Sequence, residues 1–142
     1  MDMGHEGALI RFRLDPRSGV PAYRQLVDQV RHAVSLGVLR AGDKLPPVRE
    51  VVTQITINPN TVHRAYRDLE AEGIVRGEQG RGTFVLDGIV ASATPAHQRE
   101  LRDELVRWLG KARRAGLDDD GIAALIALSM DAQRLEHKER ER

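Results

Sequence analysis

The chain has 142 residues, of which 41% are hydrophobic and 30% are charged, and its formal net charge is +1. This size and composition predict a folded, soluble protein of one domain, or of one small domain with an appendage. Disulfides and thiolate metal sites are excluded because there is no cysteine, and no apolar run reaches the roughly 18 residues that a membrane span needs. The first residues also lack the basic and apolar segments of a secretion signal. We therefore expect a cytoplasmic protein that makes no contact with a membrane.

The first patterned stretch is LIRFRL, residues 9–14, in which apolar and arginine side chains alternate. This period of two residues predicts a half-buried strand, preceded by a flexible N-terminus over residues 1–8. Pro21 then opens a predicted helix over residues 22–36, and Gly37 is placed to end it. Its apolar residues at helical spacing are Leu26, Val30, Ala33 and Val34.

Two further helices are predicted close together in the middle of the chain. The first covers residues 47–54. The second lies in TINPNTVHRAYRDLEAEG, residues 56–73, where Asn58 is suited to cap the helix and Pro59 to occupy its first position. The buried face of this second helix consists of Val62, Ala65, Tyr66 and Leu69. Two short helices joined by so tight a turn form a helix-turn-helix.

The outward face of the second of these helices has an unusual charge pattern. Asn60, Arg64 and Arg67 lie on it, with His63 at its flank, and no acidic residue occurs between Val51 and Arg67. Such a face offers amide, imidazole and guanidinium groups, which suit a polyanion. Because the net charge of the chain is nearly zero, this local pattern is what points to DNA.

After Gly73 the apolar period changes from helical to extended. Residues 74–76 and 83–86 suggest two short strands around the glycine-rich loop GEQGRG. A helix-turn-helix followed directly by a β-hairpin is a winged helix. The loop tip, Gly80 to Gly82, lets the backbone approach another surface closely, and Arg81 within it is suited to probe a minor groove. The alternative is an ordinary hairpin turn with a solvated arginine.

The rest of the chain predicts a second unit. A linker of small residues, 87–95, leads to helices over 96–115 and from Asp118, as N-cap, to about 138, and residues 139–142 form a charged tail. Two helices cannot enclose a dry core, so their apolar stripes need a partner. We expect this partner to be the same hairpin of a second subunit; the alternative is that the hairpin folds back on its own winged helix. The main residues expected at the dimer contact are Leu101, Leu105, Trp108, Leu109, Ile122, Leu125, Ile126 and Leu135.

Three motifs in order resemble the GntR family of bacterial winged-helix regulators. They are PAYRQLVDQVRHAVSLGVLRAGDKLPPVREV, INPNTVHRAYRDLEAEGIV and GRGTFV, which together cover about residues 14–86. The segment NPNTV followed by RAYRDLE, with a short helical tail, is similar to the YtrA subfamily. The chain is too short for the branch fused to an aminotransferase-like domain and for the branches with large effector-binding domains.

The resemblance implies a set of DNA contacts. Arg49 would contact a phosphate or a guanine from the first helix of the motif, and the wing tip at Gly80, Arg81 and Gly82 would enter the minor groove. The residues that correspond to the start of the family's recognition helix are Asn58, Asn60, Thr61 and His63. The chain departs from the commonest pattern at Pro47, where serine is frequent, and at His63, where other branches have arginine.

Several of these residues also have structural alternatives. Asn58 is expected mainly to cap its helix, whereas Asn60 has no such duty and is expected to contact a base or a phosphate. Thr61 could equally bond the preceding turn. Arg64 and Arg67 could pair with acids one turn along instead of with phosphate. Both tyrosines are expected in the core.

The sequence offers no catalytic centre. Its five histidines lie in separate segments, without metal-ligand spacing, and no nucleophile, phosphate-loop or dinucleotide motif occurs. We therefore predict a mainly α-helical protein with a small β-wing, without metal or cofactor, that binds a palindromic DNA operator as a homodimeric regulator, most simply a repressor. A protein-interaction module and a non-specific architectural DNA binder are the alternatives. No effector is predicted, and whether one exists is left open.

Overall fold

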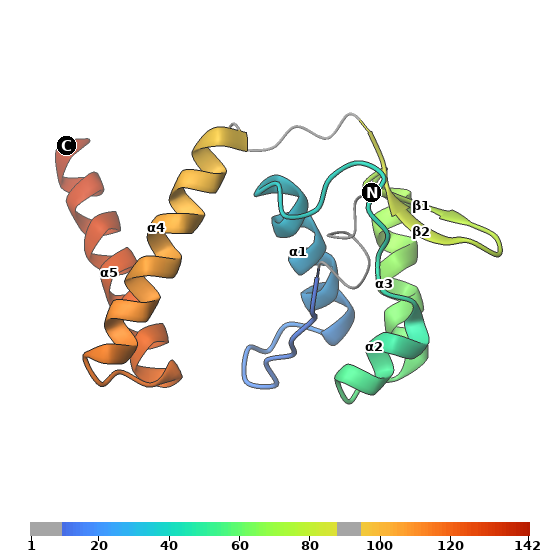
Figure 1. The fold of residues 1–142 in the computed structure, drawn as a ribbon, viewed down its shortest axis with the longest axis horizontal. Helices are drawn as coiled ribbons and strands as arrows, with labels where there is room; N and C mark the ends of the chain where they lie inside the picture. Colours follow the sequence, from blue (N-terminus) through green and yellow to red (C-terminus); the bar gives the residue numbers. More distant parts are fainter. Residues whose placement is uncertain (1–9, 88–94) are drawn as a thin grey trace. The chain divides into compact units, whose positions relative to one another are not determined.

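The computed structural model describes residues 10–87 and 95–142 (Figure 1). The chain divides into two compact units, the first ending at Gln98 and the second beginning at Arg99. The elements in chain order are α1 (Ala22–Ser35), α2 (Val48–Gln54), α3 (Pro59–Ala71), β1 (Val75–Glu78), β2 (Gly82–Val85), α4 (Pro95–Arg114) and α5 (Asp119–Arg140). The expected flexible N-terminus, residues 1–8, and nearly all of the expected linker lie outside the described residues. In the described ranges, no helix combines the length and apolar character that a membrane crossing requires.

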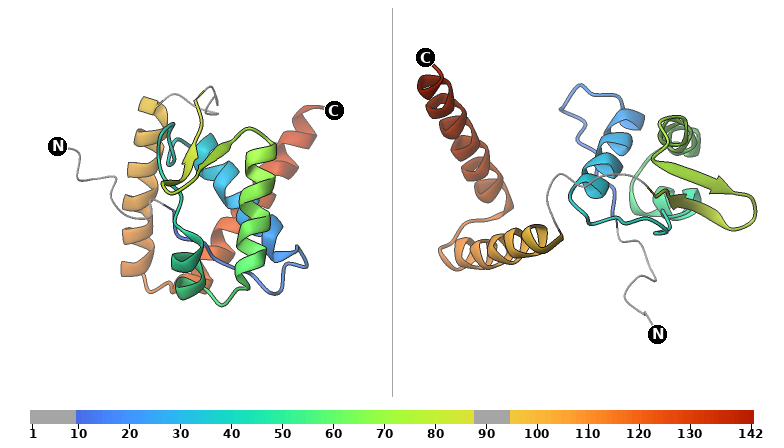
Figure 2. Two further views of the ribbon diagram at one scale, coloured as in Figure 1. Left: turned by 90° about the vertical axis from the view of Figure 1, so that its right-hand side faces the viewer. Right: turned by 90° about the horizontal axis from the view of Figure 1, so that it is seen from above.

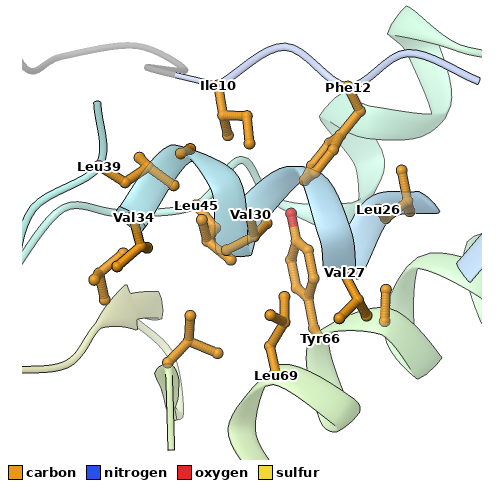
Figure 3. Packing of buried hydrophobic residues seen from close by; sticks show 14 of the residues in the cluster. Ile10, Phe12, Leu26, Val27, Val30, Val34, Leu39, Leu45, Tyr66 and Leu69 are labelled. Carbon is orange, nitrogen blue, oxygen red and sulfur yellow. The ribbon is translucent and has the colours of Figure 1, made fainter. Parts of the chain in front are cut away.

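The core of the first unit is formed mainly between α1 and α3 (Figure 3). Every residue predicted to face inward from these two helices is buried, and α2 contributes Val51. The helical spacing of apolar residues therefore predicted the buried faces correctly, because each helix packs one apolar stripe against the others. Leu39 and Leu45, from the irregular segment between α1 and α2, are also fully buried. They were not predicted because this segment has no period.

The ends of α3 are set by its sequence. The side chain of Asn58 accepts a hydrogen bond from the backbone N–H of Asn60 at 2.8 Å, and Pro59 occupies the first turn, as predicted. At the other end Gly73 adopts φ +78°, which favours glycine. The N–H of Ile74 then bonds back to the carbonyl of Leu69 at 3.0 Å. This Schellman ending closes the helix and turns the chain directly into β1.

The strand predicted at residues 9–14 is wrong, although its alternation is real. Within the described residues of this stretch, Ile10 and Phe12 are buried and the arginines are exposed, but the segment has no strand partner. Its backbone pairs instead with a side chain of α1. The N–H of Arg13 donates to Gln29 Oε1 at 2.9 Å, and Gln29 Nε2 donates to the Arg13 carbonyl at 2.7 Å. Gln25 makes the same two-way contact with Asp15. Two glutamines one turn apart thus replace a neighbouring strand.

The wing is an antiparallel pair in which Val75 lies opposite Val85 and Glu78 opposite Gly82. Its strands begin and end within two residues of the predicted ones. The second edge of β2 is also occupied, because Lys44 forms an isolated bridge with Phe84. The turn at Gly42 therefore leads into a short extended stretch that connects the wing to the body of the domain.

In the second unit, α4 and α5 diverge from the turn that joins them (Figure 2). Asp118 caps α5 as predicted, accepting from the N–H of Gly121 at 2.8 Å. The helix continues to Arg140, so the predicted charged tail is wrong in its boundary: the first two of its residues are helical. Their charges do not stop the helix because glutamate and arginine are good helix formers. Small differences also occur at the ends of the other helices, such as Pro47, which caps α2 instead of opening it.

Most apolar side chains of this second unit remain exposed within the protomer. Of the predicted dimer residues, Ile122 is buried and Trp108 and Leu109 are half-buried. The other five are exposed: Leu101, Leu105, Leu125, Ile126 and Leu135. Leu128 is 68% and Met130 is 54% exposed as well, so the apolar surface of α5 is wider than the predicted stripe.

Candidate nucleic-acid interface

The outward face of α3 carries the polar residues that the sequence placed there. Asn60, His63, Arg64 and Arg67 are exposed, and the helix holds them in fixed order because its opposite stripe is buried. Thr61 is half-buried at the edge of this face. The N-terminal turn of α3 contains no acidic residue, so nothing there opposes the positive end of the helix dipole.

The Asn58 side chain has a structural task, because its Oδ1 atom accepts the capping hydrogen bond from Asn60. A capping oxygen is not free to accept from a base. The side chain is nevertheless exposed, so its amide nitrogen can still donate. Asn60 takes part in this cap only through its backbone N–H, and its side chain points outward from the first turn.

The arginines of the helix-turn-helix have no carboxylate partner in the part of the chain that the structure describes. The acids one turn along α3 are Asp68 for Arg64 and Glu70 for Arg67, and neither forms an ion pair with its arginine in the described ranges. Glu70 accepts from the N–H of Gly77 instead, and Glu72, at the C-cap of α3, is hydrogen-bonded to Arg31 of α1, with 2.9 Å between Nε and Oε2. Arg49, on α2, is likewise exposed and without an ion pair in the described ranges. These guanidinium groups therefore remain available to an external anion.

An open cleft of about 530 Å³ lies between the start of α2, α3 and the wing. It brings together residues from separate parts of the chain: the predicted Arg49, His63, Arg67 and the wing tip. Basic groups outnumber acidic ones along its lining, so the cleft can hold part of a polyanion. Arg64, Asn60, Asn58 and Thr61 do not line this cleft; they lie elsewhere on α3.

Lys44 also lines the cleft. The bridge to Phe84 places it beside the wing, and its Cε atom lies 2.6 Å from where a Cβ on Gly82 would be. Gly82, at φ +129°, thus leaves the space that the lysine side chain crosses. The position of Lys44 depends on its pairing with Phe84. These two residues are far apart in sequence, so no local pattern predicts the pairing.

Arg81 at the wing tip is paired, unlike Arg49, Arg64 and Arg67 of the helix-turn-helix. Its Nη1 atom lies 3.0 Å from Glu78 Oε2, and its guanidinium carbon lies 5.6 Å from the centroid of the Phe84 ring. The side chain is still 74% exposed. The exposed guanidinium of Arg81 is therefore partly neutralised by the carboxylate of Glu78.

Two hydrogen bonds hold the surrounding elements against α3. Glu70 accepts from the N–H of Gly77 in β1 at 3.3 Å, and the buried Tyr66 hydroxyl donates to the carbonyl of Pro46 at 2.5 Å. Burial raises the pKa of Tyr66 far above its ordinary value, so the hydroxyl keeps its proton and remains a donor. Together these bonds fix the wing and the start of α2 relative to the recognition helix.

A helix-turn-helix whose second helix is followed directly by a two-stranded wing defines a winged helix-turn-helix protein, as predicted. The family described as "Bacterial regulatory proteins, gntR family" matches residues 22–85. The HTH-type transcriptional repressor YtrA of Bacillus subtilis (strain 168) is 37% identical over 106 residues, 75% of this chain and 82% of the relative. The chain belongs to the gntR family, which confirms the resemblance carried by its three motifs. The members of this family are regulators and not enzymes.

Two solved structures resemble the chain over most of its length. YtrA from Sulfolobus acidocaldarius, a GntR-family transcription factor, has a TM-score of 0.52 and 31% identity, with 71% of this chain and 99% of that chain covered. A transcriptional antiterminator from Listeria monocytogenes EGD-e has a TM-score of 0.55 and 28% identity, with 87% and 92% covered. The likeness to both extends beyond the winged helix into the C-terminal helices.

Proposed function

We propose that this protein is a transcriptional repressor that binds operator DNA in a sequence-specific manner, in the cytoplasm. The observation that carries the proposal is the exposed face of α3, whose arginines lack carboxylate partners in the described ranges, beside a cleft lined by further basic residues. A recognition helix in the major groove and a wing at the flank are the usual placement of this fold. The similarity to the Bacillus relative, a transcriptional repressor, supports the same conclusion.

The proposed contacts divide into base readout and phosphate contacts. Asn60, in the first turn of α3 with a free side-chain amide, is assigned to a base edge, because asparagine can pair with adenine through two hydrogen bonds. His63 and Thr61 are assigned to supporting contacts beside it. Arg49 and Arg67 are assigned to phosphates, which fix the register of the protein on the duplex. Gly80, Arg81 and Gly82 are assigned to the minor groove, and Asn58 to a phosphate through its amide nitrogen.

We further propose that the protein binds as a homodimer through α4 and α5. These helices diverge and leave large apolar side chains exposed, including Leu105 at 49% and Leu135 at 65%. A second copy of the hairpin, inserted between them, would bury these residues. A two-fold dimer implies an inverted-repeat operator whose half-sites lie about one helical turn, roughly 34 Å, apart.

The DNA proposal is tested by selecting bound sequences from a random duplex pool with the full chain, followed by footprinting of the selected sequence. The expected result is a short palindrome and a protected region of matching length. Asn60→Ala should relax the preference at one position of each half-site and cost roughly 1–3 kcal/mol there. Equal enrichment of all sequences would contradict base readout and favour a non-specific binder, and no binding at moderate salt would exclude DNA as the partner.

The dimer proposal is tested by sedimentation of the full chain. Ile126→Glu places a charge in the centre of the exposed apolar surface of α5, and we expect it to shift the protein from dimer to monomer. Gln133→Glu adds the same charge at an exposed polar position of the same helix and should leave the dimer intact. If the wild-type protein sediments as a monomer, the hairpin serves another purpose, such as packing on its own winged helix.

A further inference from the structure

Arg64 lies over an aromatic ring of a different helix. Its guanidinium carbon is 3.7 Å from the centroid of the Tyr23 ring, well within the roughly 6 Å at which a cation is attracted by the ring face. Tyr23 belongs to the first turn of α1 and packs against the hydrophobic core. The ring is therefore a fixed support, and the arginine above it is exposed.

This stacking leaves the hydrogen-bonding edges of the guanidinium unused. At 3.7 Å from the ring centroid the guanidinium carbon is too close for an N–H to point at the ring, so the contact is with the face of the planar group. The five N–H donors lie in the plane of that group. Arg64 has no ion-pair partner among residues 10–87 and 95–142. A side chain that is held in place but has unsatisfied donors is prepared to bind an external anion with two oxygens.

The position of Arg64 favours a DNA phosphate over a base as its binding partner. Asn60 lies one turn nearer the N-terminus of α3, the end at which recognition helices contact base edges. The contact with Tyr23 places the Arg64 guanidinium on the side of α3 that faces α1. We propose that Tyr23 is a positioning residue that holds Arg64 for a DNA phosphate contact at the side of the groove. This inference rests on the proposed DNA-binding function and deepens it.

The energetic role of Tyr23 would be to order Arg64 before DNA arrives. Without the ring, the long side chain has to lose its rotamer freedom on binding, and this lowers affinity without removing the contact. The aromatic face is sufficient for this role, and the hydroxyl is not required. Tyr23→Phe should therefore preserve DNA affinity, while Tyr23→Leu, which keeps an apolar side chain of useful size, should reduce it.

The experiment measures the affinity of the full chain for its selected operator at several salt concentrations. Arg64→Ala should weaken binding and lower the slope of log affinity against log salt by about one per subunit, because one phosphate contact is lost. Tyr23→Leu should weaken binding by roughly threefold to tenfold per subunit with the slope unchanged, since the contact is still made. Adding Tyr23→Leu to Arg64→Ala should have no further effect. Arg140→Ala, which removes the same charge from the end of α5, is the matched control and should behave as wild type.

The proposal is overturned if Tyr23→Leu weakens binding equally with and without Arg64, if Tyr23→Phe also loses affinity, or if Arg64→Ala changes the preferred sequence at one position. Thermal unfolding checks that Tyr23→Leu is folded. If it is not, Arg64→Lys decides: lysine keeps the charge but lacks the planar group, so affinity should fall while the salt slope stays, and full affinity would refute the stacking role. Absence of specific binding by the wild-type chain would instead refute the proposed function itself.

Discussion

The pairing of Arg81 with Glu78 predicts that replacing this glutamate strengthens DNA binding. Glu78 Oε2 lies 3.0 Å from Arg81, and Glu78 Oε1 lies 3.9 Å from Arg76. A phosphate that approaches the wing must therefore compete with a carboxylate for the same guanidinium, and it is also repelled by that carboxylate. Glu78→Gln removes the charge, keeps the shape of the side chain and frees both arginines.

The expected magnitude follows from the exposure of the pair. The side chains of Arg81 and Glu78 are 74% and 32% exposed, and pairs this exposed contribute about 0.2–1 kcal/mol. Loss of the repulsion between carboxylate and phosphate adds roughly a few tenths of a kcal/mol at physiological salt. The sum is equivalent to a gain of about twofold to tenfold in affinity per subunit, and it should shrink as the salt concentration rises.

The assay is a fluorescence-anisotropy titration of labelled operator at two salt concentrations. Glu139→Gln removes the same charge from α5 and is the control, for which no gain is expected. In a background with Arg81→Ala, the gain from Glu78→Gln should be smaller, because only the repulsion remains to be relieved. If Glu78→Gln binds no better than wild type, or binds worse, Glu78 orients Arg81 for the groove and is not its competitor.

Three further predictions concern the supports of the interface. Tyr66→Phe leaves the Pro46 carbonyl unpaired and should lower the free energy of unfolding by about 1–3 kcal/mol in urea denaturation. Because burial raises the Tyr66 pKa above its usual value of 10.0, the stability of the wild-type protein should fall as pH rises beyond that value. The stability of the variant should fall less steeply. Leu69→Ala, at a fully buried position, should cost about 2–5 kcal/mol in the same measurement. Gly82→Ala combines a φ of +129° with displacement of Lys44, so it should weaken operator binding in anisotropy titrations.

The helices and their caps were predictable because their causes are local. The buried stripe of α3 repeats at helical spacing, and Asn58, Pro59 and Gly73 each act within one turn of where they stand in sequence. The same reasoning placed Asn60 and Arg67 on the outward face. A capping residue and an outward vector follow from spacing alone, so a single sequence is sufficient to predict them.

The features that were missed depend on contacts between distant residues. The alternation at residues 10–14 correctly predicted which side chains are buried, but not that Gln25 and Gln29 would take the place of a strand. The stacking of Arg64 on Tyr23 joins two helices across 41 positions, and no local pattern reports it. By contrast, the pairing of Glu78 with Arg81 is local and could have been inferred from their spacing in the hairpin.

The distribution of acids along α3 separates the proposed contact with DNA from the contacts that hold the domain together. Its N-terminal half is free of carboxylates, whereas Asp68 and Glu70 lie in the C-terminal half and Glu72 at the C-cap. Two of these are used internally: Glu70 accepts from Gly77 of β1, and Glu72 pairs with Arg31 of α1. Acids near a helix C-terminus oppose the helix dipole, at a cost of a few tenths of a kcal/mol each, and these bonds offset that cost. Both engaged carboxylates thus lie at the end of α3 that leads into the wing, and the acid-free end is the one proposed to contact DNA.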